Sequence, residues 1–116
     1  MDTDVKKYMD YDTALGRLGG KVTLYIRLLQ QFLDSDYYSK LEEAFSSGDN
    51  EKFNVMAHSV KGVSSNLSLM EVYSYCVKFE ENIQSGADST EDMAAFKDVY
   101  EKTVKIATDF IAERNE

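Results

Sequence analysis

The absence of proline is the feature that most restricts how this chain can fold. None of its 116 residues is proline and only six are glycine, so few positions interrupt a helical backbone. Apolar residues recur at intervals of three and four through most of the chain, which is the spacing of an amphipathic α-helix. No segment alternates apolar and polar residues over the length of a strand. The sequence therefore predicts an all-α protein.

Four long amphipathic segments with short connections predict an antiparallel, up-and-down four-helix bundle. Residues 34–36 break the apolar pattern of the first segment, which either kinks there or restarts at Tyr37. A short extra N-terminal helix at residues 12–18 would be capped by Asp12 and ended by two glycines. Residues 1–10 are expected to form a short cap on the bundle. The long helices are predicted at residues 21–47, 50–67, 69–85 and 89–111.

The length, charge and cysteine content of the chain exclude several classes of protein. A chain of 116 residues suits a single domain, which we expect to span residues 1–116. A formal net charge of −8 opposes nucleic-acid binding, because phosphates attract clustered Lys and Arg. Apolar runs are too short for a membrane span and the first residues lack a secretory signal, so we expect a cytoplasmic protein. One histidine and one cysteine, Cys76, are too few for a zinc site.

The only histidine, His58, falls on the outward side of the second long helix. At roughly 100° per residue it lies almost opposite the centre of the predicted apolar stripe. Gly62, one turn further on, costs the helix about 1 kcal/mol relative to alanine, which a partner that must approach the imidazole closely would justify. Lys61 is placed to neutralise an anion on the imidazole. The predicted stripe consists of Phe53, Met56, Ala57, Val60, Val63, Ser64 and Leu67.

These residues resemble a known motif. Residues 57–62 (AHSVKG) are similar to the His-x-x-Lys-Gly core of histidine-containing phosphotransfer (HPt) domains, which act in phosphorelays. Residues 14–20 (ALGRLGG) resemble the opening element of that family, and Phe79-Glu80 stands where it commonly has Leu-Glu. The resemblance covers about residues 11–110, which is nearly the whole chain.

The chain departs from the family pattern just after the motif. Ser68 stands where the family usually has glycine, and Ser64 and Ser65 stand where it often has alanine or glycine. Ser68 and Glu71 have the Ser-x-x-Glu spacing of a capping box, which would specify the turn without glycine. The departures leave the His-x-x-Lys-Gly core intact.

The resemblance implies a phosphoryl carrier of a two-component phosphorelay. His58 would carry the phosphoryl group on its distal ring nitrogen, and Lys61 would stabilise the phosphorylated imidazole. The expected partners are response-regulator receiver domains, which would supply the aspartate and Mg²⁺, and a hybrid sensor kinase. The chain has no recognisable nucleotide motif and no carboxylate cluster beside His58, so we expect no cofactor on it and no autonomous kinase activity. We also expect a monomer.

We predict that the partner docks around the imidazole, together with exposed residues of the preceding helix. The predicted docking residues are Asn54, Val55, Gly62 and Ser65. Asn54, one turn before His58, is also a candidate for orienting the second ring nitrogen. The acidic pairs at residues 42–43 and 80–81 are interpreted as solvated faces.

Two other functions stay open at this point. The chain could be a module that docks receiver domains and regulates them without being phosphorylated. It could also be a purely structural helical adaptor in which the motif is a coincidence. An autonomous enzyme is the least expected class, because no second catalytic group can be identified.

Overall fold

The computed structural model describes residues 3–114, and the secondary structure of this part of the chain consists of helices without strands. The predicted all-α class is confirmed. Residues 1, 2, 115 and 116, which the single-domain prediction includes, lie outside the described residues. The helices are α1 (Thr3–Tyr8), α2 (Tyr11–Arg17), α3 (Val22–Ser35), α4 (Tyr37–Ser46), α5 (Asn50–Leu67), α6 (Met70–Ser85) and α7 (Thr90–Arg114).

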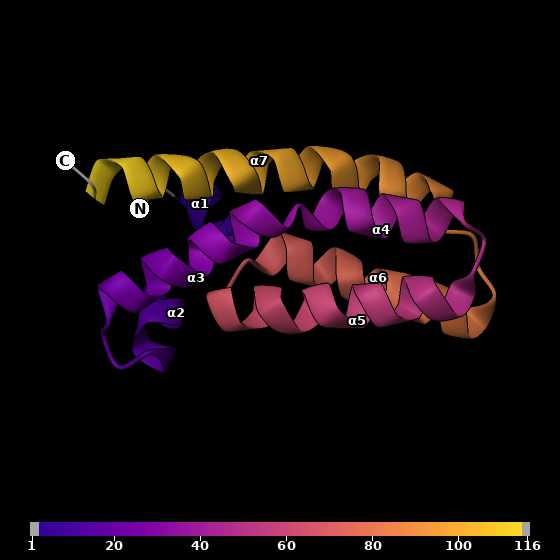
Figure 1. Ribbon diagram of the computed structural model, residues 1–116, viewed down its shortest axis with the longest axis horizontal. Helices are drawn as coiled ribbons and strands as arrows, with labels where there is room; N and C mark the ends of the chain where they lie inside the picture. Colours follow the sequence, from indigo (N-terminus) through magenta and orange to yellow (C-terminus); the bar gives the residue numbers. More distant parts are fainter. Residues whose placement is uncertain (1–2, 115–116) are drawn as a thin grey trace.

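Four helical rods run antiparallel along the 45 Å long axis of the molecule (Figure 1). Helices α3 and α4 together form the first rod, and α5, α6 and α7 form the others, in up-and-down order. Helices α5 and α7 each pack against α6 and against both halves of the first rod, and they pack against each other hardly at all. Helices α5 and α7 therefore stand diagonally across the bundle, and their outer faces point away from each other.

The N-terminal region differs from the prediction of one short extra helix, because α1 and α2 are both helical. Met9, between them, is completely buried. Asp10, not Asp12, caps α2: its Oδ1 accepts a hydrogen bond from the Thr13 amide at 3.3 Å. The Asp10 amide in turn donates to the carbonyl oxygen of Ser68 at 3.0 Å, which attaches this region to the turn between α5 and α6.

The first rod restarts at residues 35–37, which settles the choice between a kink and a restart. Asp36 has a left-handed backbone conformation with φ of 47°, and its Oδ1 accepts a hydrogen bond from the Ser39 amide as the N-cap of α4. The amide of Tyr37 donates to the hydroxyl of Tyr100 on α7 at 3.1 Å. The cap and this contact satisfy backbone amides that the interruption leaves without helical partners.

The turn between α5 and α6 contradicts the predicted capping box. Ser68 ends α5 in a left-handed conformation with φ of 55°, and its buried hydroxyl has no hydrogen-bond partner among the described residues. Helix α6 begins after Leu69 without a side-chain cap. A left-handed conformation costs a non-glycine residue about 1–2 kcal/mol, which gives a physical reason for the glycine usual at this position in HPt domains.

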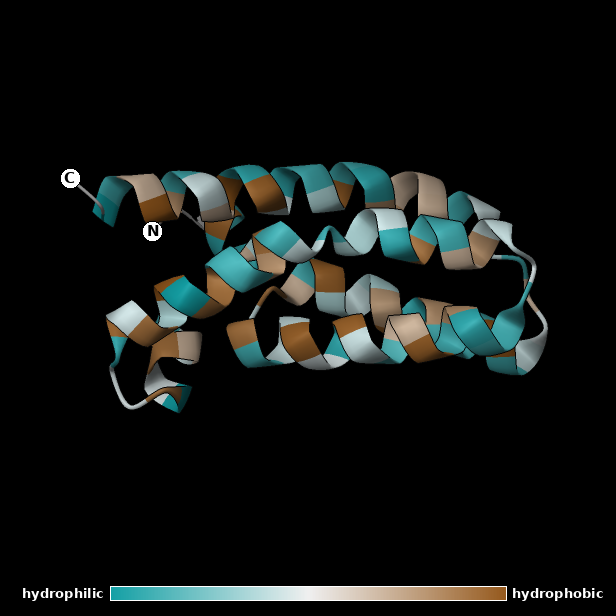
Figure 2. Cartoon of the chain, viewed as in Figure 1, coloured by the Kyte–Doolittle hydropathy of each residue, from teal (hydrophilic) through white to brown (hydrophobic). Residues whose placement is uncertain are grey.

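A continuous series of aromatic rings crosses the core, with one ring from each rod. Phe45 of α4 lies 5.3 Å from Phe53 of α5, Phe53 lies 5.3 Å from Phe79 of α6, and Phe79 lies 5.4 Å from Phe96 of α7. Figure 2 shows apolar and polar residues alternating along the helices, as expected of amphipathic rods. The contact between Phe53 and Phe79 fixes α5 relative to α6 near the motif. Within residues 3–114, no helix combines the length and apolar character needed to cross a membrane.

Candidate functional site

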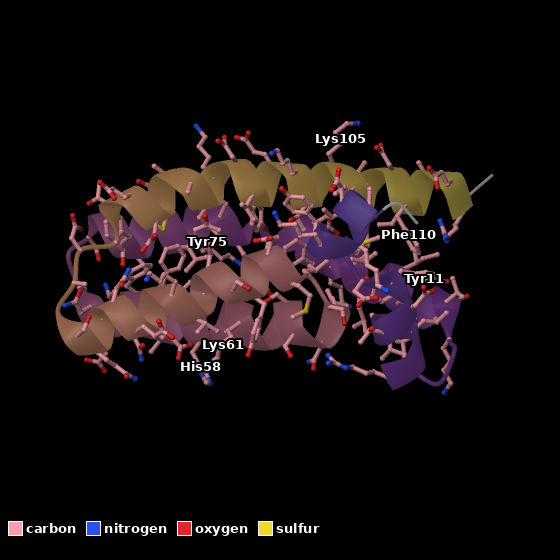
Figure 3. The ribbon with its side chains drawn as sticks, turned by 180° about the vertical axis from the view of Figure 1, so that it is seen from behind. Tyr11, His58, Lys61, Tyr75, Lys105 and Phe110 are labelled. Carbon is pink, nitrogen blue, oxygen red and sulfur yellow. The ribbon has the colours of Figure 1, made fainter. Side chains whose placement is uncertain are left out.

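His58 lies in the middle of α5 and points away from the bundle, with 72% of its side chain exposed (Figure 3). The predicted stripe faces the core: its residues are buried except Met56 and Val63, which are half-buried. Asp49 caps the helix, because its Oδ1 accepts hydrogen bonds from the amides of Glu51 and Lys52 at 3.0 and 3.2 Å. Because the apolar stripe faces the core, the imidazole on the opposite side of α5 faces solvent.

Glu80 of α6 lies directly beneath the imidazole and between the two motif side chains. Its Oε1 is 3.4 Å from His58 Nδ1, and its Oε2 accepts a hydrogen bond from Lys61 Nζ at 3.0 Å. Only 17% of the Glu80 side chain is exposed, and Oε1 is buried without a hydrogen bond among the described residues. A buried carboxylate oxygen requires a donor, and the proximal imidazole nitrogen is positioned to supply one.

The interpretation of residues 80–81 as a solvated face is wrong for Glu80. The structure puts Glu80 beside Nδ1, the second ring nitrogen of His58, and the orienting role of Asn54 stays a prediction. Sequence reasoning missed the contact of Glu80 with His58 because i, i+3 and i, i+4 spacing relates residues on one helix, and Glu80 is on the next one. The available signal was the Phe79-Glu80 pair, since Phe79 packs on α5 and places the following residue at the edge of the same interface.

Cys76 lies one turn before Glu80 on α6 and is completely buried. Burial, with a smaller contribution from the nearby Glu80 carboxylate, raises the pKa of its thiol to about 12, although the Lys61 ammonium acts in the opposite direction. The thiol is therefore a protonated core group and carries no nucleophile at neutral pH. Within residues 3–114, no three His, Cys, Asp or Glu side chains gather as metal ligands.

The predicted docking residues around His58 differ in how exposed they are to solvent. Val55 is 59% exposed, Gly62 is exposed, and Asn54 and Ser65 are half-buried. A methyl group built on Gly62 would meet nothing within 4 Å, so this glycine is not needed for helix packing. The helix surface beside the imidazole is accordingly not covered by other side chains at Gly62. The roles of these residues in docking stay predictions.

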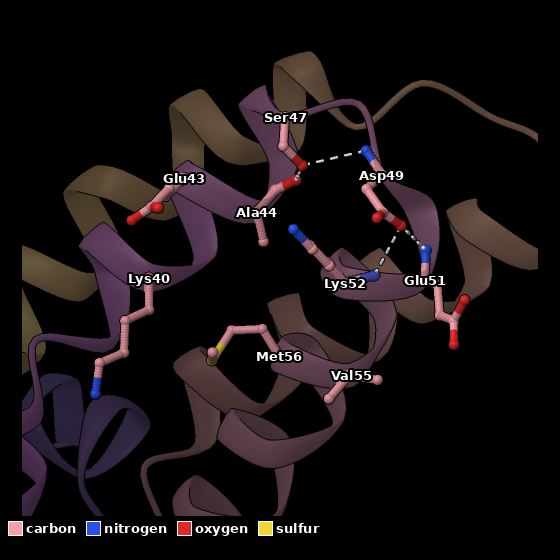
Figure 4. A pocket seen from close by; sticks show the side chains of 9 residues that line it. All are labelled: Lys40, Glu43, Ala44, Ser47, Asp49, Glu51, Lys52, Val55 and Met56. Carbon is pink, nitrogen blue, oxygen red and sulfur yellow. Dashed lines mark hydrogen bonds between the residues drawn. The ribbon is translucent and has the colours of Figure 1, made fainter.

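An open groove of about 620 Å³ lies beside this face, between the end of α4 and the start of α5 (Figure 4). Its apolar lining comes from Ala44, Val55 and Met56, and Lys40 and Lys52 are among the charged residues around it. Val55 belongs to both the groove and the surroundings of His58. Helices α4 and α5 therefore form one continuous surface beside His58.

A model of the Hpt domain family matches residues 27–105, a range that includes His58, Lys61, Gly62 and Glu80. The chain belongs to the Hpt domain family. No curated protein and no solved structure matched the chain. Hpt domains are phosphocarrier modules of two-component signalling, not kinases, and they interact with receiver domains. Helices α1 and α2 precede the matched residues.

Proposed function

We propose that this protein carries a phosphoryl group on His58 between receiver-domain aspartates of a phosphorelay. The observation that carries the proposal is the pairing of an exposed imidazole with a buried carboxylate behind it: His58 is 72% exposed, Glu80 is 17% exposed, and Nδ1 and Oε1 are 3.4 Å apart. This pair presents one ring nitrogen to a partner and ties the other to the protein.

Glu80 selects the tautomer in which His58 is a nucleophile. An ionised carboxylate only accepts hydrogen bonds, so Oε1 favours the neutral imidazole that carries its proton on Nδ1. The lone pair of Nε2 then points outward. The separation of 3.4 Å exceeds the usual hydrogen-bond length of about 2.7–3.2 Å. Rotation of the exposed ring shortens it when a partner binds, as catalytic contacts often do.

The transfer step follows from this arrangement. The Nε2 lone pair attacks the phosphorus of an aspartyl phosphate, the N–P bond forms, and the P–O bond breaks with its electron pair left on the aspartate carboxylate. The imidazole keeps its Nδ1 proton and becomes positively charged, and the charge of Glu80 stabilises it. Reversal of the same step returns the group to a second aspartate.

Lys61 supports the site from the other side of the carboxylate. Its ammonium bonds Glu80 Oε2 at 3.0 Å and is 27% exposed, so it fixes Glu80 and offsets its charge before the phosphoryl group arrives. The same ammonium, one turn from His58, is placed to stabilise the phosphorylated form. Removing Lys61 should therefore slow transfer or weaken the phospho-form without abolishing it.

The receiver domain is proposed to supply the aspartate and Mg²⁺, with no cofactor held by this chain. Phosphoryl transfer depends on positioning and charge neutralisation, and Mg²⁺ usually binds one or two carboxylates plus phosphate oxygens. Docking is proposed to use Asn54, Val55, Gly62 and Ser65, with a hybrid sensor kinase as the source of phosphoryl groups. A cytoplasmic monomer remains our prediction for the state in which the protein acts.

The test is phosphotransfer from receiver domains labelled with acetyl phosphate to the wild type and to His58→Gln. We expect label on the wild type alone, stable in base and lost in acid. Label of the same kind on His58→Gln would overturn the assignment. Receivers that bind the wild type without labelling it would favour the docking-only module, and a folded protein that neither binds nor accepts label would favour a structural adaptor.

A further inference from the structure

Arg17 of α2 reaches the face of α5 that carries His58. Its guanidinium donates a hydrogen bond from Nη1 to the carbonyl oxygen of Ser65. Ser65 follows His58 by seven positions on α5, which places it within about 20° of His58 around the helix axis and about 10 Å further along it. Gly62 lies between them and leaves the space above the helix open.

Within residues 3–114, Arg17 has no acidic partner, in contrast to Lys61. Lys61 is bound to Glu80, whereas the ion pairs among the described residues do not include Arg17. Two acidic residues at this end of the bundle have other partners: Asp10 accepts hydrogen bonds from Thr13, and Glu71 pairs with Lys7. The remaining N–H groups of the exposed guanidinium are thus available to a docking protein.

The proposed reaction defines the chemistry of the surface that meets this face. A receiver domain that presents an aspartyl phosphate and binds Mg²⁺ needs several anionic groups around that aspartate. This chain has a formal net charge of −8, so its general field repels such a surface. A local cation beside the reactive nitrogen would offset that repulsion where the two proteins touch.

We propose that Arg17 is a docking residue whose guanidinium binds the anionic surface around the phosphorylated aspartate of the receiver domain. The inference rests on the proposed function and assigns part of the partner's recognition to α2, which lies outside the residues matched by the family model. Arginine suits this role because its planar donor array can bond a carboxylate at two points while Nη1 holds the Ser65 carbonyl.

The experiment measures transfer from a phosphorylated receiver domain to the wild type, Arg17→Gln, Arg17→Lys and Lys97→Gln. Lys97 is exposed on α7, diagonally across the bundle, so its variant removes one positive charge from another face. At about 50 mM NaCl we expect Arg17→Gln to raise KM about fivefold with kcat unchanged, because charges at the rim of an interface act on association. Arg17→Lys should recover part of the loss, and Lys97→Gln should match the wild type.

Salt separates docking from a structural role. The difference between the wild type and Arg17→Gln should shrink toward nothing near 500 mM NaCl, where the Debye length falls to about 4 Å. A deficit that persists at high salt, or that Lys97→Gln shares, would overturn the role of Arg17 while leaving the carrier function in place. A wild type that takes up no label would overturn the proposed function, and this inference with it.

Discussion

The outer faces of α5 and α7 are built from different residues, although both helices bury a similar apolar stripe. Most of the side chains that helix α7 exposes are charged, including the i, i+4 pair of Lys105 and Asp109 at 3.1 Å. Helix α5 exposes His58 among small residues such as Gly62 and Ser59. In Figure 3 Lys105 and His58 lie on opposite edges of the molecule.

This difference separates the requirements of folding from those of contact with another protein. The apolar stripes explain why both helices join the bundle, and a charged exterior such as that of α7 is sufficient for solubility. The glycine in the middle of α5, Gly62, is exposed and lowers the stability of the helix. A helix that carries such a cost on its outer face is better explained by docking than by folding.

The largest effect on phosphotransfer is expected from a bulky side chain on the exposed face of α5. Gly62→Tyr should reduce phosphotransfer from a receiver domain by at least about tenfold, because the ring would stand in the path of the docking protein. The fold should survive, since a Cβ at this position meets nothing within 4 Å and tyrosine is a better helix former than glycine. The measurement is the transfer rate, with circular dichroism to check the fold.

The matched control is Ala94→Tyr, which adds the same ring to an exposed position on α7. We expect it to transfer at the wild-type rate. If both variants are equally fast, the open face of α5 is not the docking surface, and the contrast between the two helices has no functional meaning.

A second prediction concerns Glu80, whose carboxylate lies beside His58 on α5. Glu80→Gln should slow transfer by about tenfold, because the amide loses the charge that stabilises the imidazolium and no longer favours one tautomer. The imidazole ¹⁵N chemical shifts should show a larger fraction of the Nε2-protonated tautomer. Thermal unfolding checks that the bundle is intact.

Glu81→Gln serves as the control for Glu80→Gln, because it makes the same change at the neighbouring exposed position of α6. Wild-type shifts and rates are expected for it. Unchanged tautomer populations in Glu80→Gln would show that Glu80 does not orient His58.

The smallest expected effect is on stability at the end of α5. Ser68→Gly should raise the free energy of unfolding by about 1 kcal/mol, because it relieves the left-handed conformation of a non-glycine residue. The change also removes a buried hydroxyl that has no partner among the described residues. Urea denaturation measures the gain, and the transfer rate should not change.

Ser74→Gly provides the opposite sign for comparison, because Ser74 lies within α6 on its exposed side. Glycine there should lower stability by about 0.5 kcal/mol. A loss of stability in both variants would mean that the strain at Ser68 is offset by contacts of its side chain.

The sequence predicted the bundle and the direction of His58 because both depend on periodicity within one helix. It did not predict α1, the Asp10 cap or the failure of the capping box at Ser68. Those features depend on contacts between segments, such as the hydrogen bond from the Asp10 amide to the Ser68 carbonyl. A local motif cannot indicate which of two competing turn geometries such a contact selects.

The candidate site divides in the same way. His58, Lys61 and Gly62 were identified from spacing along α5 and from the resemblance to HPt domains. The contacts of Glu80 and of Arg17 join α6 and α2 to α5, so they could be established only once the helices were placed side by side.

The way His58 is held has a consequence for the energetics of a relay. The Glu80 carboxylate contacts the inner side of the imidazole at 3.4 Å, and 72% of the His58 side chain remains exposed to solvent. A pocket that enclosed the phosphoryl group would bind it tightly and make the next transfer slow, since tight ground-state binding raises the barrier to leaving. Under the proposed function, the open ring would keep the phosphorylated and unphosphorylated states of His58 close in free energy, and the direction of transfer would then depend on the relative amounts of the proteins on either side.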